Sequence, residues 1–392
     1  MQLKDGGDAL SLLGFLNSAV ASHILPAINP TLNLHPGYLE SLPFAQIDVR
    51  EKCKELVQLH ETDWNTFEVS WNFTLLPMVE RSSEVTLAKS WEAWFEVCQD
   101  RFQKVKGLEE DVNRIFIDAY ELNSELKPEV PANRISIYIA ERESDCQRLI
   151  SYAIGCMMGR YSLDEPGLIY AHTGNVGFDP IRYEKRFPAD ADGIVPITDE
   201  RWFEDDVSSR IREFVLAVWG AERLEENMVW LAESVGQKES ETPDETIRRY
   251  LADKFFKDHL QTYKKRPIYW LFRSGKQGAF QALVYLHRYN EGTLSRMRAE
   301  YVVPLIAKVA SRLDMLGKDV SAASSAAART KLQKQIEALR KKQIELLAYD
   351  EKLRHYADMR ITLDLDDGVK VNYAKFGDLV AESKVITGGS DE

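Results

Sequence analysis

The chain is long enough for several folded domains, and it is acidic overall. Its 392 residues, at roughly 100–200 residues per domain, suggest two or three domains, and a 44% hydrophobic content supplies enough apolar side chains for their cores. The formal net charge is −12, whereas a protein that coats DNA with most of its surface is expected to be basic, because binding neutralises phosphates. This charge excludes DNA contact over most of the surface and leaves room for a local basic footprint.

Cysteine usage and hydropathy indicate a cytoplasmic protein. The four cysteines form no CxxC pair, and the histidines do not cluster at zinc-ligand spacing; the cysteines are Cys53, Cys98, Cys146 and Cys156. Scattered buried thiols in a reducing compartment are therefore expected. No segment reaches the ~18 apolar residues that span a membrane, and the first residues do not resemble a signal peptide. We expect a cytoplasmic location and no membrane partner.

The N-terminal part is predicted to be mostly helical. Residues 8–25 carry apolar side chains at helical spacing, and Pro26 and Pro30 are expected to end this helix. Because a core-like helix stands at the very start, the chain resembles a domain cut in its middle. Residues 135–139 are expected to form a short strand or a helix lead-in. Further helices are predicted at 47–60, 84–105, 108–126 and 141–160.

The middle of the chain combines a long loop with further helices. Residues 161–200 are rich in Gly, Pro and Asp and show little periodicity, which predicts a long loop region. A polar link is expected at 237–245. The acidic run 204–206 is expected in the first turn of a helix, where carboxylates suit the helix dipole. Helices are predicted at 201–236, 246–262 and 276–289.

The last third is predicted to contain a long helical hairpin. Residues 293–359 are continuously helix-prone, with Gly317 and the Ser/Ala-rich run 321–328 near the middle. We favour two long helices folded back as an antiparallel, coiled-coil-like hairpin over one continuous rod. The apolar seam of the second helix is expected to consist of Leu332, Ile336, Leu339, Leu346 and Leu353.

A small β-hairpin is predicted to follow. Two alternating segments, 361–365 and 369–373, flank Asp366, Asp367 and Gly368, and an Asp-Gly pair between such segments is typical of a hairpin turn. The expected fold class is therefore mainly α: a multi-helix C-terminal region with a long helical hairpin and a small β-hairpin.

The motifs of methyl transfer do not occur. A DNA adenine methyltransferase needs a glycine-rich strand-to-helix turn for S-adenosylmethionine and an Asn/Asp-Pro-Pro-aromatic loop that holds the flipped adenine. The chain contains neither, nor a GxGxxG or P-loop pattern. No Ser/His/Asp or Cys/His arrangement can be argued from spacing. We predict no catalytic, cofactor-binding or metal-binding residue in this chain.

Two polar segments invite a functional interpretation, and we favour a structural one for each. His172, with Asn175 and Asp179 nearby, is a lone histidine, so a loop network is favoured over a metal site. In the connector 29–38, asparagines could read adenine in a DNA groove. An Asn beside a Pro is more often a turn former, so a turn at Asn29 is favoured.

The clearest bottom-up signal for DNA lies at residues 262–298, where eight cations stand against Glu291 alone, a local charge of +7. Interleaved aromatic residues could stack on bases or pack in a core. The structural alternative is a set of amphipathic helices whose basic residues pair with the acidic segment 184–245. The candidate DNA-binding residues are Lys264, Lys265, Arg266, Arg273, Lys276, Arg288, Arg296 and Arg298.

A second basic cluster lies at residues 329–354, where eight cations and four carboxylates leave +4. A solvated face of the helical hairpin is favoured here, because charges normally fill the positions outside a seam. The functional alternative is a lever that sets the distance between a recognition domain and another element.

Four segments carry a resemblance to a known family, and three of them are long. They are residues 12–20 (LLGFLNSAV) with 29–38 (NPTLNLHPGY) and 42–43 (LP), 59–73 (LHETDWNTFEVSWNF), 150–170 (ISYAIGCMMGRYSLDEPGLIY) and 266–289 (RPIYWLFRSGKQGAFQALVYLHRY). The first resembles the closing helix and connector of target recognition domains in fused restriction–modification methyltransferases. Together they resemble the C-terminal third of the PglX family, the methyltransferases of BREX phage-defence systems.

The resemblance implies a cofactor and partners. It implies an N6-adenine methyltransferase that uses S-adenosylmethionine, marks host DNA at a short asymmetric site and works inside a multi-protein defence complex. The catalytic core of that family would precede residue 1, so we expect no cofactor in this chain and S-adenosylmethionine in the parent enzyme. The expected partners are double-stranded DNA, the missing methyltransferase core and other BREX proteins.

These inferences divide the chain into five segments. They are 1–46, the C-terminal tail of a target recognition domain; 47–245, a helical middle domain with the loop region 161–200; 246–292, a basic, aromatic-rich helical segment; 293–360, the helical hairpin; and 361–392, the β-hairpin and C-terminal tail. We expect a DNA-recognition and positioning module. The alternative is a protein-interaction scaffold that docks other defence components without touching DNA, and an independent enzyme is the least favoured interpretation.

Overall fold

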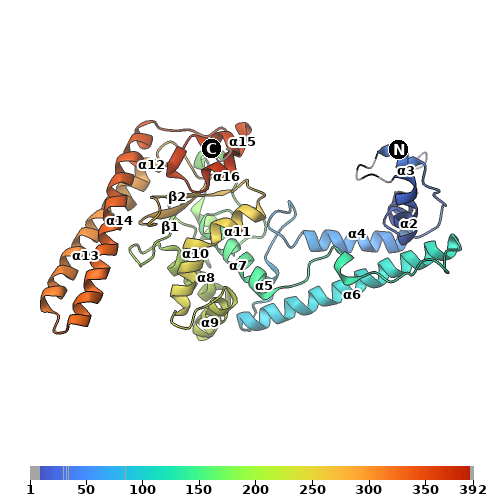
Figure 1. The fold of residues 1–392 in the computed structure, drawn as a ribbon, viewed down its shortest axis with the longest axis horizontal. Helices are drawn as coiled ribbons and strands as arrows, with labels where there is room; N and C mark the ends of the chain where they lie inside the picture. Colours follow the sequence, from blue (N-terminus) through green and yellow to red (C-terminus); the bar gives the residue numbers. More distant parts are fainter. Residues whose placement is uncertain (1–8, 30, 32, 34, 84, 389–392) are drawn as a thin grey trace. The chain divides into compact units, whose positions relative to one another are not determined.

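The computed structural model describes residues 9–29, 31, 33, 35–83 and 85–388. Helices form nearly all of its regular structure, and the sheet found in the described residues has three short strands (Figure 1), so the predicted mainly α class is confirmed. The chain divides into two compact units: unit 1 comprises Met1–Trp71 and Trp91–Glu141, and unit 2 comprises Asn72–Ser90 and Arg142–Glu392.

The N-terminal helix of unit 1 is broken, so the prediction of one helix at 8–25 is wrong. The Ser18 hydroxyl accepts the N–H of Ala21 at 3.2 Å and caps a second helix. Pro26 lies inside that helix, which continues for two residues beyond it although proline has no N–H to donate to the carbonyl of Ser22. The helices of unit 1 are α1 (Ala9–Leu16), α2 (Ala19–Ile28), α3 (Pro36–Glu40), α4 (Arg50–Trp64), most of α6 (Leu87–Ala119) and the 3-10 turn η1 (Ala132–Arg134).

Helix α6 replaces two predicted helices, 84–105 and 108–126. Gly107 lies within it and does not break it, because a single helical glycine costs only about 1 kcal/mol relative to alanine. Residues 135–139 form neither strand nor helix. Instead they form an irregular segment with a bend at Ile137, and Ile135 and Ile137 are buried against Phe102 of α6.

A buried ion pair ties α4 of unit 1 to α6. Arg101 Nη1 lies 2.7 Å from Asp63 Oδ1, and the two side chains are only 9% and 10% exposed. The other carboxylate oxygen accepts the backbone N–H of Tyr138 at 3.1 Å, and the Arg101 guanidinium stands 5.5 Å from the Trp94 ring centroid. The Asp63 carboxylate therefore joins α4, α6 and the segment that contains Tyr138.

Unit 2 is built on an antiparallel sheet in the order β1-β3-β2. Its strands are β1 (Ile194–Pro196), β2 (Tyr269–Arg273) and β3 (Gln281–Tyr285). The helix predicted at 276–289 is wrong: residues 281–285 form the central strand β3, which is buried, pairs with β2 along its whole length and pairs with β1 at residues 282–284. A short apolar run without periodicity fits such a strand as well as a buried helix.

Helices surround the irregular middle of unit 2. The segment 161–193 contains only the single-turn helices η2 (Thr173–Asn175) and η3 (Pro180–Tyr183). Asp206, from the acidic run, precedes α8 as its N-cap and accepts the N–H of Ser208 at 3.1 Å. The remaining helices before the hairpin are α5 (Pro77–Glu80), α7 (Arg142–Met157), α8 (Val207–Trp219), η4 (Ala221–Arg223), α9 (Leu224–Ser234), α10 (Pro243–Asp253) and α11 (Phe255–Thr262).

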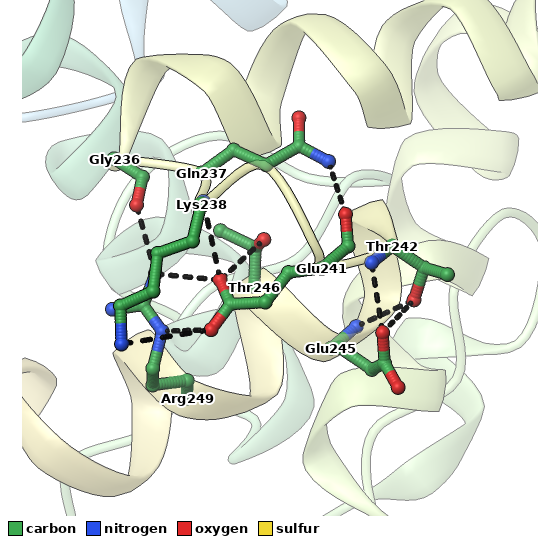
Figure 2. A network of polar contacts seen from close by, with 8 residues as sticks. All are labelled: Gly236, Gln237, Lys238, Glu241, Thr242, Glu245, Thr246 and Arg249. Carbon is green, nitrogen blue, oxygen red and sulfur yellow. Dashed lines mark hydrogen bonds and ion pairs between the residues drawn. The ribbon is translucent and has the colours of Figure 1, made fainter.

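The polar link before α10 is held by a hydrogen-bond network (Figure 2). Arg249 donates to both carboxylate oxygens of Glu241, at 2.7 and 2.8 Å, and to the Gly236 carbonyl at 2.8 Å. Thr242 and Glu245 form a capping box at the start of α10. The Arg249 hydrogen bond is the main reason that the pKa of Glu241 falls to about 2.

The long helical hairpin is confirmed, and the continuous rod is wrong. Helices α13 (Val303–Ala322) and α14 (Ala326–Asp358) lie side by side, joined by three residues (Figure 1). Ser325 caps α14 by accepting the N–H of Ala328 at 3.1 Å, while Gly317 lies inside α13. The short helix α12 (Thr293–Arg296) and the π-helical segment η5 (Met297–Val302) lead into the hairpin.

The β-hairpin predicted at 361–373 is wrong. Asp364 accepts the N–H of Asp366 at 3.0 Å, and the Asn372 amide donates to the Gly368 carbonyl at 3.0 Å, which favours tight turns over strands. The segment instead forms η6 (Leu365–Asp367), α15 (Gly368–Ala374), η7 (Gly377–Leu379) and α16 (Ser383–Thr387). The N–H of Ala381 then donates to Leu271 in β2 at 2.8 Å, so this tail covers part of the sheet edge.

A helix that crosses a membrane needs sufficient length and hydropathy. None of the described helices is by itself both long and apolar enough to cross a membrane, although α1 and α2, which meet at 71°, together pass a test of length and composition.

The Asp63–Arg101 pair yields a stability prediction. Replacing Asp63 with Ala leaves the Arg101 guanidinium buried without its carboxylate, and breaking a buried pair in this way costs about 3–5 kcal/mol. Urea denaturation followed by tryptophan fluorescence should show this loss for unit 1. The matched control Asp48→Ala removes an exposed pair with Arg50 and should change little. A D63A variant as stable as D48A would contradict the assignment.

Candidate nucleic-acid interface

The aromatic residues of the segment 262–298 form a core. Tyr269, Trp270, Phe272 and Tyr285 are each at most 1% exposed. Trp270 packs edge-on against Tyr373, with ring centroids 5.1 Å apart. These rings are not accessible for stacking on bases. The predicted helical segment 246–292 is therefore two helices followed by a buried β-hairpin that presents basic residues only at its ends.

The first group of cations lies on a turn between α11 and β2, here called the basic turn (residues 264–266). Lys264 and Lys265 adopt left-handed backbone conformations, with φ of 49° and 60°. The N–H of Lys265 donates to the Leu260 carbonyl at 2.7 Å, which closes the end of α11. All three basic side chains are exposed, and in the described chain none takes part in an ion pair or hydrogen bond.

His259 fixes the start of β2, just after the basic turn. The sequence pattern did not identify this residue. Its Nε2 atom accepts the backbone N–H groups of Ile268 and Tyr269, at 3.1 and 3.2 Å, where β2 begins. The ring stacks on Tyr269 with centroids 4.9 Å apart and is 2% exposed. Burial, together with the nearby Arg160 charge, lowers the pKa of His259 to about 3. The neutral ring is therefore a fixed acceptor for the start of the strand.

The second group of cations lies at the other end of the strand pair, on the turn between β2 and β3. Glu345 of α14 accepts the Ser274 hydroxyl at 2.6 Å and the N–H groups of Gln277 and Ala279 at 2.7 and 3.1 Å. A Cβ atom on Gly275 would lie 2.7 Å from Glu345 Oε2, so this approach requires glycine. Lys276 projects from the turn, exposed and without a partner among the described residues.

Arg273 also lies at this turn but is half-buried. Its Nε donates to the Gly275 carbonyl at 3.0 Å. The strand between the basic turn and this turn has five residues, so at about 3.3 Å per residue the two groups of cations stand more than roughly 13 Å apart. The continuous patch expected from the sequence is thus two separate sites.

Arg288 lies in the interior and is unavailable to DNA. It is 1% exposed, and its guanidinium donates to the carbonyl oxygens of Asp190 and Ala191, at 2.7 and 2.8 Å, and to Asn175 Oδ1 at 3.1 Å. It also lies 3.8 Å from the Phe178 ring centroid. We therefore withdraw Arg288 as a DNA-binding candidate, because a charge count along the sequence does not distinguish a buried cation from an exposed one.

The remaining two candidates are paired with carboxylates. Arg298 lies 2.7 Å from Asp350 of α14, and its side chain is 33% exposed. Arg296 lies 3.5 Å from Glu300 one helical turn away. Neither partner belongs to the acidic segment 184–245 that sequence reasoning proposed. Four of the eight candidates, the three on the basic turn and Lys276, thus remain as exposed cations without an ion pair in the described structure.

Arg160 is a half-buried cation, which sequence reasoning did not single out. Its Nε donates to the Tyr161 hydroxyl at 3.1 Å and its Nη1 to the Tyr285 hydroxyl at 3.2 Å. Burial, together with the charges of Arg160 and His172, lowers the pKa of His287 to about 4. Arg160, which follows α7, is thus joined to β3 through the hydroxyl of Tyr285.

The polar residues near 172–179 and in the connector 29–38 form hydrogen bonds within the fold, in agreement with the structural role favoured for both segments. Asp179 accepts the N–H of Ile181 at 3.1 Å and caps η3, while Asn175 binds Arg288. Asn29 Oδ1 accepts the N–H of Thr31 at 3.1 Å, as a turn former does. Among the residues that the structure describes, no group of three or more His, Cys, Asp or Glu side chains is arranged to hold a metal ion.

Unit 1 contains an open groove of about 800 Å³, lined by both apolar and polar side chains, between α1, α2, α4, α6 and the segment 129–136. Leu13, Val57 and Trp64 line it and are 42%, 42% and 54% exposed. Glu109 also faces the groove, and burial raises the pKa of its carboxyl. Such a lining suits an apolar ligand surface that carries a positive charge.

The described residues do not fit S-adenosylmethionine. The sheet found in the described residues is antiparallel, so no parallel strand runs through a glycine-rich turn into a helix there. That turn is the element that the cofactor requires. No methyl-transfer step is therefore derived from these residues.

Two known proteins are similar to this chain over nearly its whole length. The adenine-specific methyltransferase BrxX of Escherichia coli O9:H4 (strain HS) is 45% identical over 417 residues, covering 99% of this chain and 34% of that protein. The adenine-specific methyltransferase PglX of Lacticaseibacillus casei (strain Zhang) is 41% identical over 394 residues, covering 98% of this chain and 32% of that protein. The chain thus spans about a third of the length of these curated relatives. No protein-family model matches it. The resemblance to the PglX family is confirmed.

The depressed pKa of His259 predicts a pH-dependent stability. The unfolded chain binds a proton at His259 below about pH 6.5, whereas the folded chain does not until about pH 3, so stability falls as the pH drops through 6.5. At pH 5 this single group costs about 2 kcal/mol relative to pH 7.5. Urea titrations at both pH values should show this loss, and it should shrink in His259→Gln. An unchanged pH dependence in that variant would refute the assignment.

Proposed function

Because this chain is homologous over nearly its whole length to one third of two PglX-like adenine-specific methyltransferases, we propose that it is their C-terminal DNA-recognition and positioning portion. The parent protein would be a site-specific DNA N6-adenine methyltransferase of a BREX phage-defence system, acting in the cytoplasm. The catalytic core and its S-adenosylmethionine would lie in the other two thirds. Double-stranded DNA, that core and other BREX proteins would be the partners.

The observation that carries the DNA-binding part of this proposal is the basic turn. Lys264, Lys265 and Arg266 project from a backbone locked by α11 and His259, and they are exposed in a chain whose net charge is −12. Cations held on a rigid frame can meet phosphates with little loss of conformational freedom. Lys276 supplies a further cation at the far end of β2.

Such contacts would position DNA and would not read its sequence. Lysine and arginine side chains that meet phosphates set the register of a protein on the duplex, while base edges carry the specificity. The buried rings of the sheet cannot supply base readout. Sequence recognition in the parent enzyme would therefore depend on other residues, and this chain would orient the duplex for them.

A salt titration tests the basic turn. We expect the chain to bind a 30-base-pair duplex at ~50 mM salt, where phosphate contacts are strong. The variant Lys264→Asn, Lys265→Asn, Arg266→Gln retains the left-handed turn, because Asn tolerates that conformation. Each phosphate contact that it loses should lower the slope of log affinity against log salt by about 0.9.

The matched control for this titration is Lys54→Gln, Lys89→Gln, Lys127→Gln. It removes the same charge from exposed lysines elsewhere and should retain the slope. No detectable binding by the unmodified chain at ~50 mM salt would overturn the proposed function. Equal slopes for the two triple variants would exclude the basic turn from the interface.

The groove of unit 1 favours a second candidate function, a scaffold that docks another protein. Its apolar side chains and the carboxylate of Glu109 complement an amphipathic helix with leucines on one face and lysines beside them. This function is compatible with DNA contact by unit 2.

A synthetic helix of that composition tests the groove. Because Trp64 lines the groove and is half-exposed, binding should shift its fluorescence emission to shorter wavelength. Val57→Glu places a further charge among the apolar side chains of the lining and should weaken binding at least tenfold, while Val229→Glu alters an equally exposed valine of α9, outside the groove, and should not. Equal binding by both variants would contradict the docking function.

A further inference from the structure

The helical hairpin has a distal arm, residues 311–341, whose two helices pack against each other. Within this range only Leu316 is buried, and the seam residues are half-buried. The proximal part differs: Leu346, Tyr349 and Leu353 of α14 are at most 2% exposed. The arm contributes little to the core of unit 2, so the stability of that core does not explain its charges.

Charge is distributed unequally between the arm and its base. The arm carries seven cations and three carboxylates, a local charge of +4 in a chain of −12. The cations are Arg312, Lys318, Arg329, Lys331, Lys334, Arg340 and Lys341.

Three cations at the base of the hairpin have carboxylate partners, while the exposed Arg354 has none in the described structure. Arg298 binds Asp350, Lys342 binds Asp199 and Lys352 binds Asp378. By contrast, the structure places no ion pair on any of the seven arm cations, although Glu337 lies within four residues of three of them. Each such i,i+3 or i,i+4 pair would stabilise the helix modestly, and the arm forms none of them.

Three of the unpaired lysines form a stripe along α14. At 100° per residue, Lys331, Lys334 and Lys341 fall within an arc of about 80°, and at 1.5 Å per residue they span about 15 Å. Lys334 and Lys341 lie on the side away from the seam, and Lys331 lies at its flank. All three are exposed. The connection between the helices, residues 323–325, carries only Ala and Ser, so no bulky side chain blocks the approach of a rod-shaped polyanion.

We propose that the distal arm binds the sugar–phosphate backbone of double-stranded DNA, with Lys331, Lys334 and Lys341 as its phosphate contacts. This inference rests on the proposed function, because it requires a chain that binds DNA. The contact is independent of sequence, since it involves phosphates alone. The arm would act as a second clamp on the duplex, separate from the basic turn. It replaces the interpretation of the basic cluster 329–354 as a solvated face.

The test uses the full 392-residue chain and two unrelated 30-base-pair duplexes. The arm variant is Lys331→Gln, Lys334→Gln, Lys341→Gln, in which glutamine preserves helix propensity, and circular dichroism checks its helicity. Three lost phosphate contacts lower the salt slope by about 2.7, so between 50 and 200 mM salt the unmodified chain should lose about 40-fold more affinity than the variant. The control is again Lys54→Gln, Lys89→Gln, Lys127→Gln.

The outcomes separate the two proposals. A lower slope for the arm variant on both duplexes, with an unchanged slope for the control, supports the arm. An unmodified chain that binds DNA, together with an arm variant that retains its full slope, overturns the arm and leaves the proposed function standing; the lysines would then meet an acidic protein or solvent. An effect on one duplex only overturns the sequence-independent contact. No binding by the unmodified chain overturns both proposals.

Discussion

The guanidinium of Arg288 donates to the carbonyl oxygens of Asp190 and Ala191 and to the side chain of Asn175, and so attaches a long irregular segment to the residues that follow β3. Strand β1 begins three residues after Ala191 and pairs with β3. A buried cation with three acceptors stays in place because any move would leave a charge unsatisfied in the interior. Arg288 thus joins two points of the segment 161–193 to the end of β3, beside the start of the third strand of the sheet.

The basic residues of this chain fall into two groups that differ in their burial. Arg101, Arg160 and Arg288 are buried or half-buried groups whose acceptors are carboxylates, tyrosine hydroxyls or carbonyl oxygens. The cations of the basic turn and of the distal arm are exposed and unpaired in the described structure. Because the total charge is −12, these exposed cations are local exceptions on an acidic molecule. Such a distribution favours a polyanion that contacts the protein at a few points over one that wraps around the protein.

The sheet of unit 2 gives the basic residues a rigid frame. Glu345 fixes the turn between β2 and β3, and His259 fixes the start of β2. The aromatic rings of both strands fill the space between these anchors. A frame of this kind keeps the basic turn and Lys276 at a constant separation, as a positioning surface requires. The groove of unit 1 is a different kind of surface, with apolar side chains beside three carboxylates (Glu61, Glu109 and Glu129), so the two units suit different partners.

The sequence by itself determined the mainly α class, the helical hairpin and the relationship to adenine-specific methyltransferases, because helical periodicity is local and long matching segments are specific. It did not determine that residues 281–285 form a strand, since a short apolar run fits a buried strand and a buried helix equally. It also misplaced the β-hairpin, because side-chain hydrogen bonds of Asp364 and Asn372 stabilise turns where alternation predicted strands. Only the tertiary structure decided which cations are accessible: linear charge counts treat Arg288 and Lys264 alike, whereas burial and the positions of distant acceptors distinguish them.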